Sequence, residues 1–106
     1  MATISAPIDA TQTPAWEALR QHFNDIKQNF SLKQAFEDDP QRVQKLTFTA
    51  GDYLFDLAKN LITEETLQLL AALGRAVKVE ERRDAMFAGE IINTTEDRAV
   101  LHSALR

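Results

Sequence analysis

The 106-residue sequence contains no cysteine, which excludes both a disulfide framework and a thiolate metal site. It has only two histidines, His22 and His102, and they lie far apart without the close spacing of a helical metal-binding pair. Its three glycines, Gly51, Gly74 and Gly89, are scattered, so no glycine-rich loop is present to hold a phosphate. We therefore expect no metal and no cofactor.

Long apolar runs and clustered positive charge are also missing. No apolar stretch approaches the ~20 residues that span a bilayer, and the N-terminus lacks the basic and apolar segments of a secretory signal. The formal net charge is -4, and basic residues alternate with acids, unlike a nucleic-acid-binding surface. With 44% hydrophobic and 26% charged residues, the composition predicts one soluble, helix-rich, cytoplasmic folding unit that binds neither nucleic acid nor membrane.

The first part of the chain predicts a flexible leader over residues 1–12 and a helical segment over residues 13–106. Thr13 and Pro14 form a cap followed by proline, which is typical of a helix start. A helix over 14–29 is predicted by five apolar residues spaced three and four apart: Trp16, Leu19, Phe23, Ile26 and Phe30. This aromatic stripe is typical of a core or an interface and not of a ligand cage.

Short elements are predicted next. Ser31 and Gln34 form a capping box for a short helix through Phe36, and Asp39-Pro40 starts another turn that includes Arg42 and Val43. From Lys45 the pattern changes to strand formers, and residues 46–57 predict a β-hairpin that turns at Ala50-Gly51-Asp52. The predicted fold class is therefore mostly α with one β-hairpin.

Helices dominate the remainder of the prediction. Thr63 caps a long helix whose buried stripe contains Leu67, Leu70, Leu73 or Gly74, and Val77. Residues 80–87 predict a shorter helix that stops at Gly89, and residues 90–94 a connector. Thr94 or Thr95 is expected to cap a last helix with one apolar face, made of Val100, Leu101, Ala104 and Leu105.

Three charged groups are candidates for chemistry. Asp38 and Asp39 resemble an acid–base pair, but adjacent acids before a proline are more typical of a helix cap with a solvated neighbour. The run over residues 80–84 is typical of a solvated face with exposed ion pairs. In the predicted last helix, Arg98, His102 and Arg106 align on one side, where they would hold an anion, face solvent or contact another part of the protein. No nucleophile is paired with a base, so no catalytic, substrate-binding or metal-binding residue is assigned.

Several segments, taken in order, resemble the N-terminal region of the glucose-6-phosphate isomerase (phosphoglucose isomerase) family. Residues 36–42 resemble its F-x-x-D-P-x-R element, and residues 56–60 resemble its D-Y-S-K-N motif, with Leu57-Ala58 where Tyr-Ser is usual. Residues 86–106 resemble M-F-x-G-E-x-I-N-x-T-E-x-R-A-V-L-H-x-A-L-R. The resemblance covers about residues 13–106.

The resemblance implies the N-terminal helical segment of an α/β sugar isomerase (SIS-type fold). Members of the family are cytoplasmic, usually homodimeric enzymes of glycolysis and gluconeogenesis. They interconvert glucose 6-phosphate and fructose 6-phosphate through an enediol without a metal, using a histidine, a glutamate and phosphate-holding Ser and Thr residues. All of these lie beyond the position equivalent to Arg106, so none is carried onto this chain. The expected partner is the remainder of the same polypeptide, and the chain alone is expected to be inactive and architectural.

Two alternatives remain open at this point. One is a free-standing helical interaction module without enzymatic activity. The other is a small anion-binding protein that uses Arg98, His102 and Arg106.

Overall fold

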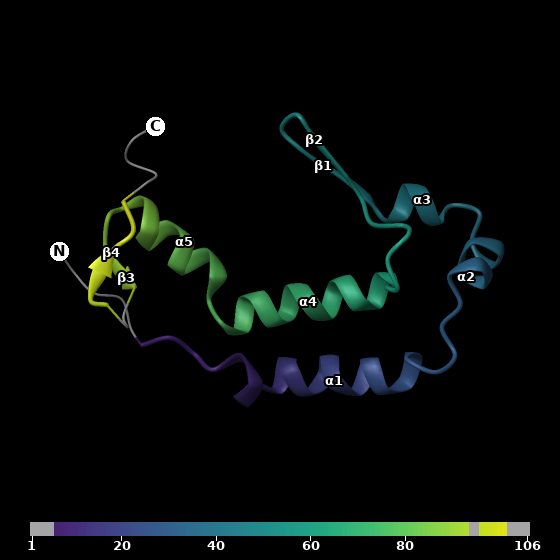
Figure 1. Ribbon diagram of the computed structural model, residues 1–106, viewed down its shortest axis with the longest axis horizontal. Helices are drawn as coiled ribbons and strands as arrows, with labels where there is room; N and C mark the ends of the chain where they lie inside the picture. The colour runs from purple at the N-terminus through teal and green to yellow at the C-terminus, as the bar shows by residue number, and fades with distance from the viewer. Residues whose placement is uncertain (1–5, 94–95, 102–106) are drawn as a thin grey trace. The chain divides into compact units, whose positions relative to one another are not determined.

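The computed structural model describes residues 6–93 and 96–101. The chain forms two compact units, residues 18–70 and residues 1–17 with 71–106, and the boundaries fall inside two helices. The elements, in chain order, are η1 Ala10–Gln12, α1 Pro14–Ile26, α2 Leu32–Asp38, α3 Arg42–Lys45, β1 Thr47–Ala50, β2 Tyr53–Asp56, α4 Glu64–Ala76, α5 Val79–Phe87, β3 Ile91–Asn93 and β4 Arg98–Ala99. Figure 1 labels the α-helices and the strands. The mostly helical class with a β-hairpin is confirmed, and a second strand pair, β3 with β4, was not predicted.

Helix α1 begins as predicted and ends earlier than predicted. The hydroxyl of Thr13 accepts a hydrogen bond from the backbone N–H of Trp16 (3.1 Å), which caps the helix before Pro14. The helix ends at Ile26 because residues 27–29 form a turn, in which Phe30 N–H donates to the Ile26 carbonyl (2.9 Å). The last three residues of the predicted leader, Ala10–Gln12, form η1, with the Asp9 side chain accepting from Thr11 N–H (3.0 Å).

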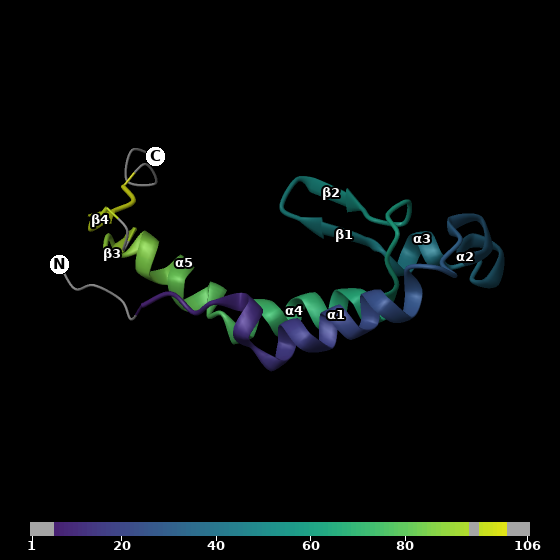
Figure 2. The same cartoon turned by 60° about the horizontal axis from the view of Figure 1, so that its bottom comes forward.

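The hairpin forms where the sequence predicts it, except that Ala50, expected in the turn, is the last residue of β1. Strands β1 and β2 are antiparallel, with Phe48 opposite Phe55 and Ala50 opposite Tyr53, and Figure 2 shows them as a two-stranded ribbon. Gly51, the first of the two turn residues, has a φ of 58°, the positive angle that a tight hairpin turn requires at this position. At the base of the hairpin the Leu57 N–H donates to the carbonyl of Leu46 (2.9 Å).

The core of the 18–70 unit lies at this base. Leu46 and Ala58 are each only 1% exposed, whereas many larger apolar side chains of the chain are not covered. Within this unit the first turn of α4 lies beside the end of α1 (Figure 2). The unit therefore buries a small core and leaves much apolar surface in solvent.

Helix α4 starts as predicted, because the hydroxyl of Thr63 accepts from the backbone N–H of Thr66 (3.3 Å). Helix α5 ends with both hydrogen bonds of a Schellman motif, from Gly89 N–H to the Met86 carbonyl (3.1 Å) and from Glu90 N–H to the Ala85 carbonyl (3.0 Å). Gly89 has a φ of 77°, so the predicted glycine stop is confirmed.

The predicted last helix is wrong over residues 96–101. The side-chain oxygen of Asn93 accepts from Glu96 N–H (3.2 Å), and Asp97 takes a φ of 56°, so the chain reverses and Arg98–Ala99 pairs with β3. Asn93 therefore serves a turn between two strands, and residues 91–93 form a strand and not a connector. Thr94, Thr95 and residues 102–106 lie outside the described residues.

No helix in the described part of the chain is long and apolar enough to cross a bilayer.

Candidate functional site

The basic row predicted from Arg98, His102 and Arg106 does not lie on a helix at its first member. Arg98 is an exposed residue of strand β4, opposite Asn93, and successive side chains of a strand point to opposite faces. His102 and Arg106 lie outside the described residues. The helical spacing that would align these three side chains is therefore absent at Arg98.

The two adjacent acids, Asp38 and Asp39, bind different partners. Asp39 accepts from the backbone N–H of Gln41 (2.9 Å) through one oxygen and from the Lys45 ammonium (2.8 Å) through the other. Asp38 accepts from the Gln34 side chain (2.7 Å), one turn earlier on α2. The exposed, separate position of Asp38 agrees with the prediction, whereas Asp39 caps the turn that precedes α3 and not α3 itself, whose N-cap residue is Gln41.

Electrostatics around Asp39 follow from these contacts. The hydrogen bond from Lys45, together with that from Gln41 N–H, lowers the pKa of Asp39 below its ordinary value of 3.8. The hydrogen bond between Lys45 and Asp39 also raises the pKa of Lys45 above 10.5. Glu64, whose carboxylate oxygen lies 3.8 Å from the Lys45 ammonium, makes a smaller contribution. Each group thus favours the charged form of the other, which is the opposite of what an acid–base catalyst near neutral pH requires.

The charge run over residues 80–84 is only partly a solvated face. Arg83 forms an exposed ion pair with its neighbour Asp84 (3.0 Å). Arg82 is half-buried, and its guanidinium donates to the backbone carbonyl of Ile92 (3.1 Å). Arg82 therefore holds strand β3 against α5, a role that the charge pattern did not predict.

The aromatic stripe remains largely uncovered. Phe23 is 58% exposed, with the Lys27 ammonium 5.6 Å from its ring centre, and Trp16 is also exposed. Phe30 is half-buried because it lies under the guanidinium of Arg42 (5.8 Å). The stripe therefore has the character of an interface more than of a completed core.

Arg42 makes several buried contacts in the 18–70 unit, and the sequence predicted it only as part of a short turn and of the F-x-x-D-P-x-R element. It is 6% exposed, and its guanidinium donates to three backbone carbonyls, those of Ala58 (2.9 Å), Asn60 (3.0 Å) and Ile62 (3.0 Å). The rings of Phe30 and Phe36 lie 5.8 and 5.5 Å from its central carbon. The planar, multi-donor guanidinium suits this role, which a lysine ammonium would not reproduce.

This arginine joins two sequence motifs that are separate along the chain. Phe36 and Arg42 belong to the first motif, and the carbonyls of Ala58 and Asn60 belong to the second. Within the second motif, Asp56 accepts from Ala58 N–H (2.9 Å), which turns the chain after β2. The two motifs are therefore one structural unit that fixes the path from the hairpin to α4.

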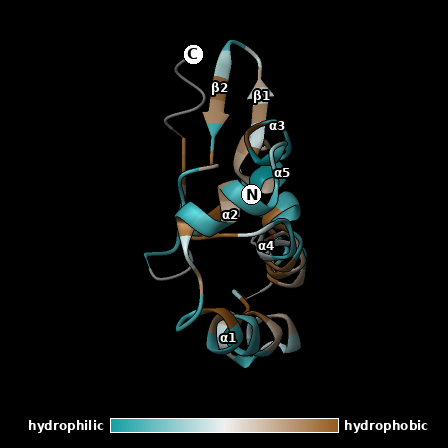
Figure 3. Ribbon diagram, turned by 90° about the vertical axis from the view of Figure 1, so that its right-hand side faces the viewer, coloured by the Kyte–Doolittle hydropathy of each residue, from teal (hydrophilic) through white to brown (hydrophobic). Residues whose placement is uncertain are grey.

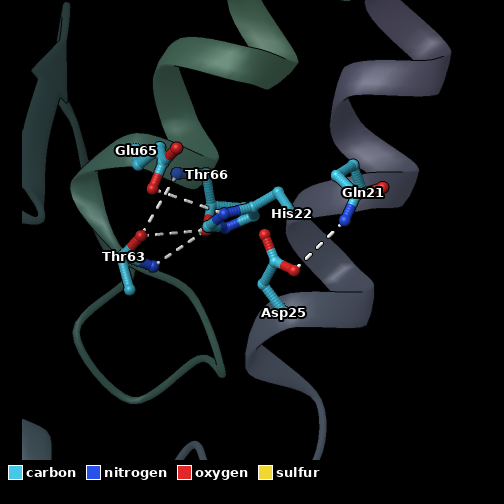
Figure 4. A network of polar contacts seen from close by, with 6 residues as sticks. All are labelled: Gln21, His22, Asp25, Thr63, Glu65 and Thr66. Atoms are coloured by element: carbon cyan, nitrogen blue, oxygen red, sulfur yellow. Dashed lines mark hydrogen bonds and ion pairs between the residues drawn. The ribbon is translucent and has the colours of Figure 1, made fainter.

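A second buried polar contact joins α1 to α4. His22 is 6% exposed, and its Nε2 lies 2.6 Å from the Thr66 hydroxyl, as Figure 4 shows. Nδ1 of the same ring lies 3.5 Å from a carboxylate oxygen of Glu65, which can only accept. With a proton on Nδ1 facing this acceptor, Nε2 accepts from the Thr66 hydroxyl. Thr63 N–H donates to that hydroxyl as well (3.0 Å), so the cluster is internally satisfied.

These clusters have the chemistry of braces and not of an active site. The donors of Arg42 are directed to backbone carbonyls, and His22 is enclosed against a threonine. A hollow of about 280 Å³ beside Arg42 is lined also by Asp38, so it lacks the single-sign lining that a phosphate group favours. Among residues 6–93 and 96–101, no three His, Asp or Glu side chains gather as metal ligands would.

Comparisons with known proteins assign the sequence to a family. Residues 56–106 match the family model described as phosphoglucose isomerase. The chain is 58% identical over 104 residues to a glucose-6-phosphate isomerase of Bifidobacterium longum, which covers 97% of the chain and 18% of that relative. It is 54% identical over 106 residues to one of Mycobacterium avium (100% and 19%) and 57% identical over 103 residues to one of Mycobacterium tuberculosis (96% and 18%). The chain thus spans less than a fifth of the length of these curated relatives.

Proposed function

The chain belongs to the phosphoglucose isomerase family and corresponds to its N-terminal part, and we propose that the whole protein interconverts glucose 6-phosphate and fructose 6-phosphate. The observation that carries the proposal is the identity of 54–58% over essentially the entire chain to curated glucose-6-phosphate isomerases. The reaction is an aldose–ketose isomerisation of glycolysis and gluconeogenesis. A coupled assay of the full-length protein with fructose 6-phosphate tests it, and absence of turnover would overturn the proposal.

Within that enzyme we assign an architectural role to these residues. The buried polar side chains of the described residues are Arg42, His22 and Thr66. Arg42 is directed toward backbone carbonyls, and His22 and Thr66 face each other. Asp38 accepts a hydrogen bond from the Gln34 side chain, and Asp39 accepts from the Lys45 side chain and from the backbone N–H of Gln41. Proton transfer and phosphate binding are left to the part of the enzyme outside this chain, and the partner of the chain is the remainder of the same polypeptide.

The 106-residue chain by itself is expected to be inactive. The reason is that the described residues contain neither a pair of groups arranged for proton transfer nor a phosphate-binding loop. The coupled assay, run on the purified 106-residue chain at high concentration, is expected to match a protein-free blank. Turnover above that blank, which is abolished by denaturing the sample, would contradict the expectation.

The parent enzyme is proposed to be a cytoplasmic homodimer, as the family resemblance implies. Sedimentation of the full-length protein tests the dimer, and fractionation of cells tests the location.

The alternative function is a free-standing interaction module, and it is supported by the exposed apolar side chains of the chain. Reading the native gene after Arg106 separates the two proposals, because the isomerase requires continuation into sugar-phosphate-binding domains.

A further inference from the structure

The β1–β2 hairpin has two chemically different faces. Cross-strand partners share a face and alternate residues change face, so the register places Phe48, Ala50, Tyr53 and Phe55 together. We name these four residues the aromatic face. The rings of Tyr53 and Phe55 lie 6.3 Å apart, which agrees with that assignment. The opposite face consists of Thr47, Thr49, Leu54 and Asp56.

The aromatic face is not covered within the 18–70 unit. Phe48 is 44% exposed, Phe55 49% and Tyr53 74%. Figure 3, coloured by hydropathy, shows hydrophobic positions on both strands of the ribbon. A two-stranded hairpin is marginally stable in water, and an aromatic patch of this kind marks a contact surface.

The size of the patch limits what can cover it. Strands of four residues are about 13 Å long and lie about 5 Å apart, so the hairpin presents a footprint on the order of 150 Å². A stable complex between separate proteins buries about 800 Å² on each partner. The patch is therefore too small to hold a separate molecule alone, whereas a tethered segment of the same chain avoids most of the entropy cost of association.

We infer that the aromatic face docks on an apolar surface of the same polypeptide, formed by the part of the full-length protein that follows residue 106. The inference rests on the proposed function, since the curated relatives are more than five times as long as the segment they share with this chain. The four residues of the aromatic face carry no charge, so the receiving surface is apolar, with one polar group at its rim for the Tyr53 hydroxyl. On the opposite face, Thr49, Leu54 and Asp56 stay in solvent.

Site-specific photo-cross-linking in the full-length protein tests this docking. Tyr53 is replaced by p-benzoylphenylalanine, which keeps an aromatic ring, and a matched control carries the same replacement at Leu54 on the opposite face. The expected result is a product from position 53 with the mass of a single chain, cross-linked to a peptide beyond residue 106. Position 54 should give no cross-link to that peptide.

Three results would overturn the inference. They are no cross-link from position 53, cross-links confined to residues 1–106, and a product with the mass of two chains, which would identify a second copy as the occupant. Hydroxyl-radical footprinting of the unmodified full-length protein is the second measurement. Relative to their rates in the unfolded protein, Phe48 and Phe55 should be oxidised several-fold more slowly than Leu54, and equal protection would count against docking. Isomerase activity is measured on the same samples. If the protein is inactive but still gives the expected cross-link, the result contradicts the proposed function and not the docking.

Discussion

Arg42 shows how a buried cation is accommodated by backbone carbonyls. Taking a charge out of water is costly unless its donors find partners, and three carbonyls and two aromatic rings surround this guanidinium. The acceptors lie 16 to 20 residues farther along the chain. Nothing in the local sequence around Arg42 indicates which carbonyls these are, so the sequence could predict a short turn there but not the brace.

Replacing Arg42 with methionine should destabilise the 18–70 unit markedly. The variant keeps much of the aliphatic volume but leaves the carbonyls of Ala58, Asn60 and Ile62 without their donor, at a cost of roughly 2–4 kcal/mol. Urea unfolding followed by circular dichroism measures the change. The matched control is Arg83→Met, which removes an exposed ion pair and should change stability by less than about 1 kcal/mol. Equal effects of the two substitutions would contradict the brace.

The side chain of Asp39 should have a pKa below the ordinary aspartate value of 3.8. Its pKa is lowered chiefly by the hydrogen bond from Lys45, so its contribution to stability is present above pH 3.8 and is lost as the pH falls through the lower folded value. Carboxyl-carbon NMR titration reads this midpoint directly. In Lys45→Met the midpoint should move back toward 3.8, whereas Lys59→Met, an exposed lysine elsewhere in the unit, should leave it unchanged. A midpoint that is insensitive to Lys45 would refute this cause.

At the scale of elements, the start or end of a helix and the position of a turn were predictable where a single residue determines them. Ser31 accepts from Gln34 N–H, Thr63 from Thr66 N–H, and Gly51 and Gly89 take positive φ, as their positions in the sequence indicated. Residues 90–94 were predicted as a connector before a capped helix, and the prediction failed because Asn, Thr and Glu suit a helix start and a tight turn equally well. Pairing of Arg98–Ala99 with β3 decided between them.

The junction of α4 and α5 contains a strained residue that makes a clear prediction. Lys78 has a φ of 61° at the position where glycine usually ends a helix, and a left-handed angle costs a residue with a Cβ about 1–2 kcal/mol. Lys78→Gly should therefore stabilise the chain by about 0.5–1 kcal/mol, after the greater flexibility of glycine in the unfolded state is subtracted. Thermal unfolding measures it.

Lys78→Ala is the control for that prediction, because it removes the same ammonium but keeps the Cβ. It should give no stabilisation. If alanine and glycine raise the unfolding temperature equally, backbone strain is not the cause.

At the scale of the whole molecule, the exposed apolar surface is the main feature that separates this chain from a self-sufficient domain. Phe23, Tyr53, Leu54 and Leu61 are each more than half exposed, while Leu46 and Ala58 are almost fully buried. Identity over nearly the full chain to relatives more than five times its length gives this surface a natural explanation. We propose that the rest of the polypeptide covers this surface.

The sequence by itself determined the starts of α1, α2 and α4, the glycine stop of α5, the place of the hairpin and the family resemblance, because capping, turn geometry and motif residues depend on side chains only a few positions apart. Only the tertiary structure decided that Arg42 unites two motifs, that His22 meets Thr66, and that the aromatic face of the hairpin is left uncovered. These outcomes depend on which distant segments meet. A buried polar group takes whatever partner the packing brings within hydrogen-bond distance, and local sequence does not encode that partner.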